Sequence, residues 1–258
     1  MSWGLGLCLF LLALIAYVAV AESRHRENPD DKVVPTFAKM VDGFYSVAFE
    51  KDRNEEYRLW VDTWASFKRV GIAALFLIFA VLLGLHMGLF PYWESLFLKF
   101  MLFFDKVPAL ALLPILFIAF GLGETSKIAL ITIGVFPTIT LDTYLRAKNI
   151  AGEQIMKGLT LGATHAEIAY RIVLPQILPD VLDTIRLNFK AMILFLIAAE
   201  AVSSDVGLGY RIFLVRRYLA MDIIIPYVIW ISLLAFLADA GLRWFIQKKF
   251  RWRTQGAG

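Results

Sequence analysis

Long apolar blocks alternate with charged segments along the whole chain. The blocks cover residues 3–21, 70–90, 107–123, 128–141, 187–202 and 223–242. A helix needs roughly 20 apolar residues to cross about 30 Å of hydrocarbon, and most of these blocks approach that length. The pattern therefore predicts an all-α membrane protein with about six transmembrane helices.

Two of these blocks have a second interpretation. The first block ends in Ala19-Val20-Ala21, which is typical of a signal-peptide cleavage site, but no Lys or Arg precedes it. A retained helix is therefore favoured over a cleaved signal peptide. The block 128–141 is short for a full crossing, and Pro137 within it predicts a kink.

Residues 35–44 have apolar positions near helical spacing, which indicates either a short helix on the membrane surface or a solvated connector.

Composition strengthens the membrane prediction. Of 258 residues, 59% are hydrophobic and 19% are charged, whereas soluble domains average about 25% charged. The chain is basic, but its basic residues gather at block edges and after the last block. That position favours anchoring of helix ends on the cytoplasmic side over nucleic-acid binding. The basic residues that follow the last apolar block are Arg243, Lys248, Lys249, Arg251 and Arg253.

Cysteine and histidine offer no further chemistry. Cys8 is the only cysteine, so no disulfide forms within the chain, and the three histidines are far apart in sequence. No cofactor, metal site or catalytic set of residues is predicted. The sequence GLGETSK at 121–127 has the wrong spacing for a phosphate-binding loop, so any ATP hydrolysis belongs to another chain.

The polar segment 142–186 predicts a helical hairpin. Residues 150–161 have the composition of a short helix, which Gly162 is suited to end. Thr164 and Glu167 fit a capping box that starts a second helix, and this helix is expected to end near Leu174 because Pro175 follows. Pro179 then suits the first turn of the fifth transmembrane helix. The hairpin is either a coupling element pushed by a partner or an ordinary interfacial hairpin.

This segment resembles the EAA motif of ABC importer permeases. Gly162, followed after nine residues by Ile172-Val173-Leu174-Pro175, matches the G-x9-I-x-L-P core of that motif. PALALLP at 108–114, FGLGETSK at 120–127 and the stretch from Ala199-Glu200 to GLGY at 207–210 resemble the nitrate, sulfonate and taurine subfamily in the same order. The likeness covers roughly residues 60–252. Where the motif places Glu-Ala-Ala, this chain has Met156-Lys157-Gly158, and Glu153, one turn earlier, is the candidate substitute.

The resemblance implies a type I importer fold and a division of the chain. Residues 1–22 are expected to form an N-terminal transmembrane helix, and residues 23–68 a polar connector with an interfacial helix. Residues 69–250 would form the permease domain with its coupling hairpin at about 150–174, and residues 251–258 a cytoplasmic tail. The ATPase-coupling residues that it implies are Glu153, Gly162, Ala163, Thr164, Glu167, Ile172, Leu174 and Pro175.

The resemblance also implies partners and a location. A permease of this kind pairs with a second permease subunit, identical or different, in a bacterial inner membrane. It docks cytoplasmic ATPase subunits and receives a small solute, such as nitrate, a sulfonate or taurine, from an extracytoplasmic solute-binding protein. The permease itself is not an enzyme. The alternative function is an ATP-independent secondary transporter or channel, although the sequence has no internal repeat.

Charges inside the apolar blocks mark a candidate translocation pathway. An ionisable group within a membrane-spanning segment is expensive, and Glu200 lies near the outer end of the fifth block, about three turns after Lys190. The simpler interpretations are that Glu200 lies at the membrane interface and that the Lys190 side chain extends inward, and both are favoured over substrate contact. Asp142 and Asp239 are expected to lie at helix ends. Orientation follows the basic C-terminus, which predicts that segment 142–186 is cytoplasmic and that Arg211, Arg216 and Arg217 lie outside, against the usual charge bias.

Overall fold

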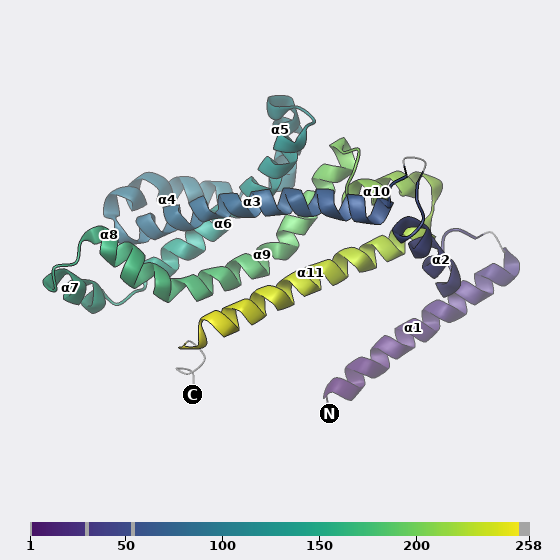
Figure 1. The fold of residues 1–258 in the computed structure, drawn as a ribbon, viewed down its shortest axis with the longest axis horizontal. Helices are drawn as coiled ribbons and strands as arrows, with labels where there is room; N and C mark the ends of the chain where they lie inside the picture. Colours follow the sequence, from purple (N-terminus) through teal and green to yellow (C-terminus); the bar gives the residue numbers. More distant parts are fainter. Residues whose placement is uncertain (1, 29–30, 53–54, 253–258) are drawn as a thin grey trace. The chain divides into compact units, whose positions relative to one another are not determined.

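A computed structural model describes residues 2–28, 31–52 and 55–252, and every regular element in these residues is a helix (Figure 1). The α-helices are α1 (Ser2–Glu27), α2 (Phe37–Ala48), α3 (Arg58–Leu89), α4 (Pro91–Asp105), α5 (Leu113–Phe120), α6 (Glu124–Lys148), α7 (Gly152–Thr160), α8 (His165–Glu167), α9 (Leu174–Ser203), α10 (Leu208–Val215) and α11 (Met221–Lys249). A π-helical segment (Ile168–Val173) joins α8 to α9, and short 3-10 helices cover Ala109–Leu112 and Arg216–Tyr218.

The all-α membrane fold predicted from the sequence is confirmed. In the part of the chain that the structure describes, α3, α6 and α11 are long and apolar enough to cross a membrane, and the number reaches five if each of two bent helix pairs counts as one span. The prediction of about six also counted residues 3–21, which lie within α1. Retention of that helix as a crossing stays a prediction, and residues 253–258 of the predicted tail lie outside the described residues.

Two predicted helices are longer than the apolar blocks that indicated them. α3 begins at Arg58 and not near residue 70, so Arg69 lies inside a helix and not before one. α6 runs from Glu124 to Lys148, although its apolar block suggested a segment too short to cross. Helix formation continues through polar residues whose side chains find partners, so apolar length alone underestimates both helices. Pro137 lies within α6.

The block 107–123 is not one straight span. α4 precedes it, and the 3-10 helix at Ala109–Leu112 and α5 follow at 91° to α4. Gly121 then takes a positive φ of 76°, and the chain bends through Leu122 and Gly123 before α6 begins at Glu124. No apolar block of the sequence predicted α4.

The helix that begins at Thr164 does not end at Leu174. Helical structure continues through the π segment into α9, where Pro175 lies in the first turn and Pro179 lies inside the helix. Pro175 therefore lies within a continuous helical run, where it lacks an N–H for the hydrogen-bond ladder, and the wider π turn before it accommodates this irregularity. The prediction of a break at Pro175, with a new helix at Pro179, is therefore wrong.

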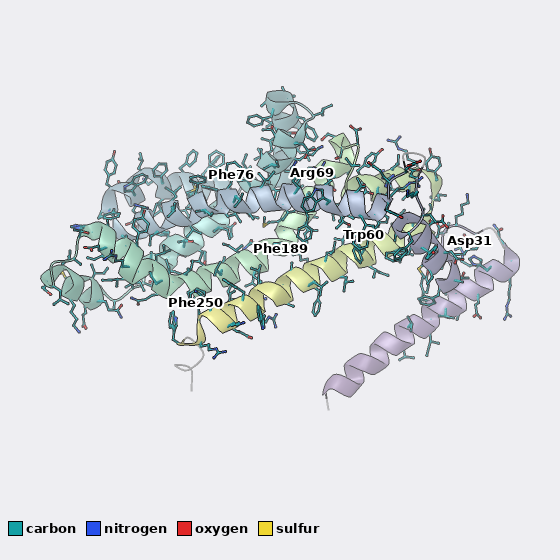
Figure 2. All side chains as sticks on the ribbon, viewed as in Figure 1. Asp31, Trp60, Arg69, Phe76, Phe189 and Phe250 are labelled. Carbon is teal, nitrogen blue, oxygen red and sulfur yellow. The ribbon has the colours of Figure 1, made fainter. Side chains whose placement is uncertain are left out.

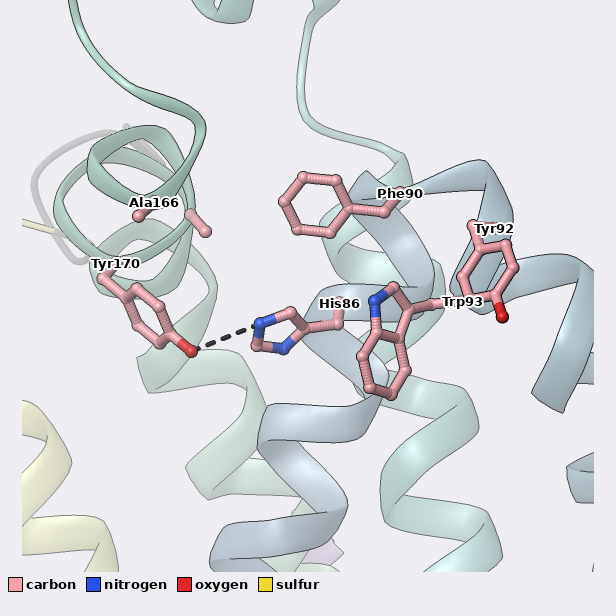
Figure 3. A pocket seen from close by; sticks show the side chains of 7 residues that line it. His86, Phe90, Tyr92, Trp93, Ala166 and Tyr170 are labelled. Carbon is pink, nitrogen blue, oxygen red and sulfur yellow. Dashed lines mark hydrogen bonds between the residues drawn. The ribbon is translucent and has the colours of Figure 1, made fainter.

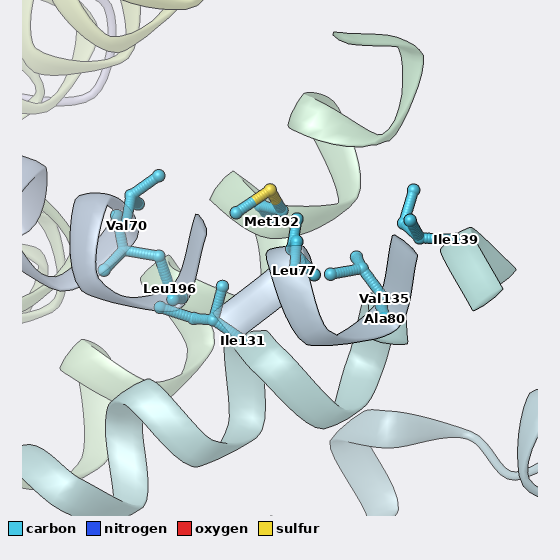
Figure 4. Packing of buried hydrophobic residues seen from close by; sticks show 9 residues of the cluster. Val70, Leu77, Ala80, Ile131, Val135, Ile139, Met192 and Leu196 are labelled. Carbon is cyan, nitrogen blue, oxygen red and sulfur yellow. The ribbon is translucent and has the colours of Figure 1, made fainter. Parts of the chain in front are cut away.

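The larger of two compact units contains residues 66–204 and the part of α11 from Leu233 onward. Its core joins α3, α6 and α9, and its buried residues are shown in Figure 4. They are Val70, Ala73, Leu77, Ala80, Ile131, Val135, Ile139, Met192 and Leu196. α6 and α9 pack extensively against one another. These helices hold the site described below.

Small residues on α3 allow it to lie directly against α6. A Cβ added at Gly84 would lie 2.4 Å from the carbonyl oxygen of Thr140, and one added at Gly88 would lie 2.6 Å from the Cβ of Ala147. Gly84 and Gly88 are four residues apart on one helix face, which is the spacing used for close helix approach in membranes. Larger side chains at either position would force the two backbones apart.

The smaller unit contains the described residues up to Ala65 and Asp205–Ser232. Its centre is Asp62, a fully buried carboxylate. Asp62 accepts hydrogen bonds from the backbone N–H of Gly207 (2.9 Å), from Nε of Arg211 (2.8 Å) and from the hydroxyl of Tyr227 (3.0 Å). The predicted short helix near residues 35–44 is present as α2, which begins after a Thr36 cap.

Candidate functional site

The hairpin between α6 and α9 is built by local signals. α7 ends where Gly162 adopts a left-handed φ of 87°, a conformation that favours glycine. The backbone N–H of Glu167 donates to the Thr164 hydroxyl at 3.3 Å, and the N–H of Thr164 donates to the Glu167 carboxylate at 3.0 Å. The predicted helix, glycine turn and capping box are therefore confirmed.

The inner face of the hairpin is a small apolar core. Ala163, Ile172 and Leu174 are half-buried and pack around the buried Ile168 and Val173. Gly158 of α7 is also buried, and an added Cβ there would lie 3.1 Å from Cδ1 of Ile172. The glycine that replaces the last alanine of the EAA pattern therefore lets α7 lie close to the π segment.

The outer face of the hairpin is exposed. Glu153 and Lys157 are exposed on α7, together with Met156, which is 61% exposed. Leu161 at the tip is 88% exposed. Met156 and Leu161 thus add apolar surface beside the charged side chains of α7. Among the predicted coupling residues, Glu153, Gly162 and Thr164 lie on this exposed side, whereas Ala163, Ile172 and Leu174 form the framework.

Aromatic side chains connect the hairpin to the end of α3. The Tyr170 hydroxyl lies 3.3 Å from Nε2 of His86, and both residues line a pocket of about 490 Å³ (Figure 3). The other lining residues are Phe90, Tyr92, Trp93, Ala166 and Ala169. The hairpin is thus attached to α9 through the chain and to α3 through this pocket, so that a displacement of the hairpin reaches both helices.

The end of α11 lies beside the same hairpin. Phe250 and Trp252 line a groove of about 410 Å³ with Pro175 and its neighbours Arg171, Ile172 and Gln176. The basic residues Lys248, Lys249 and Arg251 therefore sit at the hairpin end of the larger unit. Basic residues at a helix end favour the cytoplasmic side, which agrees with the predicted location of the hairpin.

A buried charge cluster lies at the other end of the larger unit. Arg69 projects from α3 (Figure 2), and its Nη1 donates to Glu200 of α9 at 2.6 Å. Its Nε and Nη2 donate to the two carboxylate oxygens of Glu124 on α6, at 2.7 and 2.8 Å. Lys127 donates to Glu124 at 2.9 Å, and Ser66 donates to Glu200 at 2.7 Å. The cluster joins three helices.

Burial divides the cluster into an inner and an outer part. The side chains of Arg69 and Lys127 are 4% exposed and that of Glu200 is 0% exposed, but that of Glu124 is 57% exposed. Two cations and two carboxylates balance, as buried charges require. Glu200 is thus fully buried among protein side chains and bound to Arg69, whereas Lys190 is exposed; their depths in the membrane stay predictions.

The predicted helix-end aspartates also lie inside helices. Asp142 on α6 pairs with Arg146 at 2.6 Å and accepts a hydrogen bond from Thr184 of α9 at 2.7 Å. Asp239 on α11 pairs with Arg186 of α9 at 2.5 Å. Each carboxylate thus connects α9 to a neighbouring helix and does not cap a terminus.

The sequence pointed to Glu200 but not to Arg69, Glu124 or Lys127. Arg69 opens the predicted permease domain, and Glu124 and Lys127 belong to the GLGETSK stretch between two apolar blocks. The available signal was the spacing of Glu124 and Lys127, which is that of a helical ion pair. Nothing local connects either of them to Arg69, which lies 55 residues before Glu124.

The helical bundle with its exposed hairpin places the chain in the class of transporter membrane subunits. The family described as "binding-protein-dependent transport system inner membrane component" matches residues 77–251. The chain therefore belongs to this family, the permease subunits of ABC importers. It is a multi-pass inner-membrane component, and the family has no catalytic activity of its own. The alternative of an ATP-independent transporter or channel is thereby set aside.

Several relatives are similar over much of the chain. The taurine transport system permease protein TauC of Escherichia coli (strain K12) is 32% identical over 76% of this chain and 72% of its own length. The putative aliphatic sulfonates transport permease protein SsuC of the same organism is 30% identical over 57% of this chain and 56% of its own length. The chain thus spans just over half of the sulfonate relative that it matches.

A solved structure supports the fold. A chain of the MetNI methionine ABC transporter in an inward-facing conformation is 18% identical, with a TM-score of 0.64 over 74% of this chain and 95% of that chain. The prediction of a type I importer permease fold is confirmed.

Proposed function

We propose that this chain forms the translocation pathway for a small oxyanion of the sulfonate type and couples its import to a separate ATPase through the hairpin at residues 150–174. The observation that carries the coupling proposal is the geometry of that hairpin. It presents an exposed face, and it is held to α9 by the chain and to α3 by the pocket around His86. A partner that moves the hairpin would move two helices of the core.

The ATPase-coupling residues divide into two roles in this proposal. Glu153, with its exposed neighbours Met156 and Leu161, would contact the ATPase. Gly162, Thr164 and Glu167 would set the angle between α7 and the following helix. The framework residues Ala163, Ile172, Leu174 and Pro175 would keep the hairpin rigid. Rigidity matters because a compliant hairpin would absorb the displacement and not transmit it.

The remaining partners follow from the family. Its name implies a solute-binding protein, which would deliver the solute from the extracytoplasmic side, and a second permease subunit, identical or different, would complete the pathway. A sulfonate-type anion is supported by the names of two relatives that are about 30% identical, one a taurine and one an aliphatic sulfonate permease. The anion fits the two buried cations at the far end of α9 from the hairpin.

Capture of the ATPase tests the coupling proposal. The intact chain in lipid nanodiscs should retain its cognate ABC ATPase subunit, whereas a variant carrying Glu153→Lys, Met156→Asp and Leu161→Asp should lose at least 10-fold in affinity for it. These three side chains are exposed, so the substitutions change the docking face without opening the core.

The matched control is Tyr218→Asp, a charged substitution at another exposed large side chain (70%), outside the hairpin. Capture should be unchanged in the control. Equal capture by the intact chain and the triple variant would contradict docking through this hairpin.

A further inference from the structure

We infer that the Arg69–Lys127 pair is an oxyanion-binding site on the translocation pathway and that Glu124 is a resident counter-ion which an incoming anion replaces. This inference rests on the proposed function, because it names the contact that the transported anion would make. It concerns the outer end of the larger unit, about 39 Å along α9 from Leu174 at a rise of about 1.5 Å per residue.

The geometry of Arg69 supports an oxyanion. Its Nε and Nη2 donate to the two oxygens of one carboxylate, at 2.7 and 2.8 Å, which is the paired arrangement that guanidinium groups use for carboxylates and other planar or tetrahedral oxyanions. Its Nη1 is directed to Glu200 and fixes the guanidinium. A sulfonate presents two oxygens that can occupy the same two donors.

Burial identifies Glu124 as the replaceable partner. Both cations are almost fully buried, as is Glu200, but the Glu124 side chain is 57% exposed. A buried carboxylate bound to Arg69 and Ser66 is difficult to remove, whereas an exposed carboxylate at the start of α6 can turn away into solvent. With Glu124 turned away, Arg69, Lys127 and Glu200 would leave one positive charge for a monovalent anion to neutralise.

The turn before Glu124 leaves room for a solute. Residues 121–125 are all exposed. A Cβ added at Gly121 or at Gly123 would have no heavy atom within 4 Å, so the space in front of the turn is open. An anion can therefore reach the exposed Glu124 carboxylate at this turn, and it reaches Arg69 and Lys127 only when Glu124 moves aside.

The chemistry also explains why the cluster is neutral at rest. Glu200 balances one of the two cations, so without Glu124 the cluster would keep one uncompensated buried positive charge, which would destabilise the fold and hold any anion tightly. The Glu124 carboxylate neutralises that charge and makes the net gain on anion binding small. Weak binding is what a pathway needs if the solute is to leave again.

The test measures anion binding by the full-length wild type and by Glu124→Gln, both in lipid nanodiscs. Binding is read from the rise in the thermal unfolding midpoint when sodium methanesulfonate replaces sodium chloride at the same ionic strength. Removing the resident carboxylate should lower the apparent dissociation constant for methanesulfonate about 10-fold, because the anion no longer competes with it. Lys127→Gln added to Glu124→Gln should remove the gain. Methylammonium chloride, which supplies an organic cation in place of the organic anion, should shift the unfolding midpoints of the wild type and of Glu124→Gln equally.

The matched control is Glu94→Gln, which removes another first-turn glutamate that is bound to a lysine (Lys148) and to a hydroxyl. It should leave methanesulfonate binding at the wild-type level. Equal binding by Glu124→Gln and the wild type, or an equal gain in Glu94→Gln, would overturn the inference. If Glu124→Gln does not fold, Arg69→Lys with Glu124 kept replaces it. This variant should bind methanesulfonate more weakly than the wild type, and unchanged binding would overturn the inference.

ATPase capture, measured on the same preparations, separates this inference from the proposed function. Retained capture without anion binding would overturn the anion site alone. Anion binding without capture would overturn the coupling proposal and leave the site in place.

Discussion

Arg69 is the residue on which the buried charge cluster depends. From its position within α3, Arg69 binds both Glu200, which is fully buried, and Glu124, which is largely exposed. Loss of either carboxylate leaves the buried Arg69 guanidinium with less opposite charge around it. The consequences differ because water can take the place of the exposed Glu124 carboxylate but not of the buried Glu200 carboxylate. The inner pair is therefore expected to govern stability and the outer pair to govern binding.

Glu200→Ala tests the structural role of the inner pair. Removing one partner of a buried ion pair leaves an uncompensated charge and typically costs about 3–5 kcal/mol. We expect the free energy of unfolding in detergent to fall by that amount. Lys106→Ala is the control, because Lys106 is 79% exposed and its pair with Asp105 is solvated. If Glu200→Ala unfolds with the same free energy as Lys106→Ala and the wild type, the structural role of the buried Arg69–Glu200 pair is contradicted.

The partners of Glu200 could not be found from the sequence, although Glu200 itself could. A glutamate inside an apolar block is a visible anomaly, but its partners Arg69 and Ser66 precede it by more than 130 residues. Contacts at that separation are set by how α3, α6 and α9 pack, and that packing depends on the close approach at Gly84 and Gly88. No local pattern contains this information.

At the scale of elements, the hairpin was the most predictable part of the chain. Gly162, Thr164 and Glu167 lie within six residues, and each acts on the backbone beside it. The helix boundary at Pro175 was not predictable in the same way. Local rules treat a proline as a break, whereas the π segment at Ile168–Val173 lets the helix pass it.

Gly162→Val tests whether the hairpin turn transmits displacement. A left-handed backbone costs a residue with a Cβ about 1–2 kcal/mol, and more for a β-branched one, so valine should shift the turn. We expect ATP hydrolysis by the assembled complex to lose its dependence on the solute-binding protein, while membrane insertion stays normal.

Gly152→Val is the matched control for the turn. Both glycines have open space around an added Cβ, but only Gly162 has a positive φ, so the pair isolates the backbone effect. The control should retain coupled hydrolysis. Normal coupled hydrolysis in Gly162→Val would show that the turn geometry is unimportant.

At the scale of the whole molecule, orientation depends on which charges are counted. The predicted outer location of Arg211 opposed the usual charge bias, but Arg211 is bound to the buried Asp62 in the smaller unit. A paired arginine contributes little to that bias, which leaves Arg216 and Arg217 as the exceptions to it. Lys248 and Lys249 in the last turn of α11, and Arg251 after it, favour a cytoplasmic hairpin.

Sided cysteine labelling tests the cytoplasmic location of the hairpin most directly. With Cys8→Ala the chain has no other cysteine, so Leu161→Cys and Leu122→Cys, which replace exposed side chains at the hairpin tip and at the turn before α6, each give one reporter. A membrane-impermeant maleimide should label Leu161→Cys only in inverted vesicles and Leu122→Cys only in intact spheroplasts. Labelling of Leu161→Cys in intact spheroplasts would place the hairpin outside and contradict its coupling to a cytoplasmic ATPase.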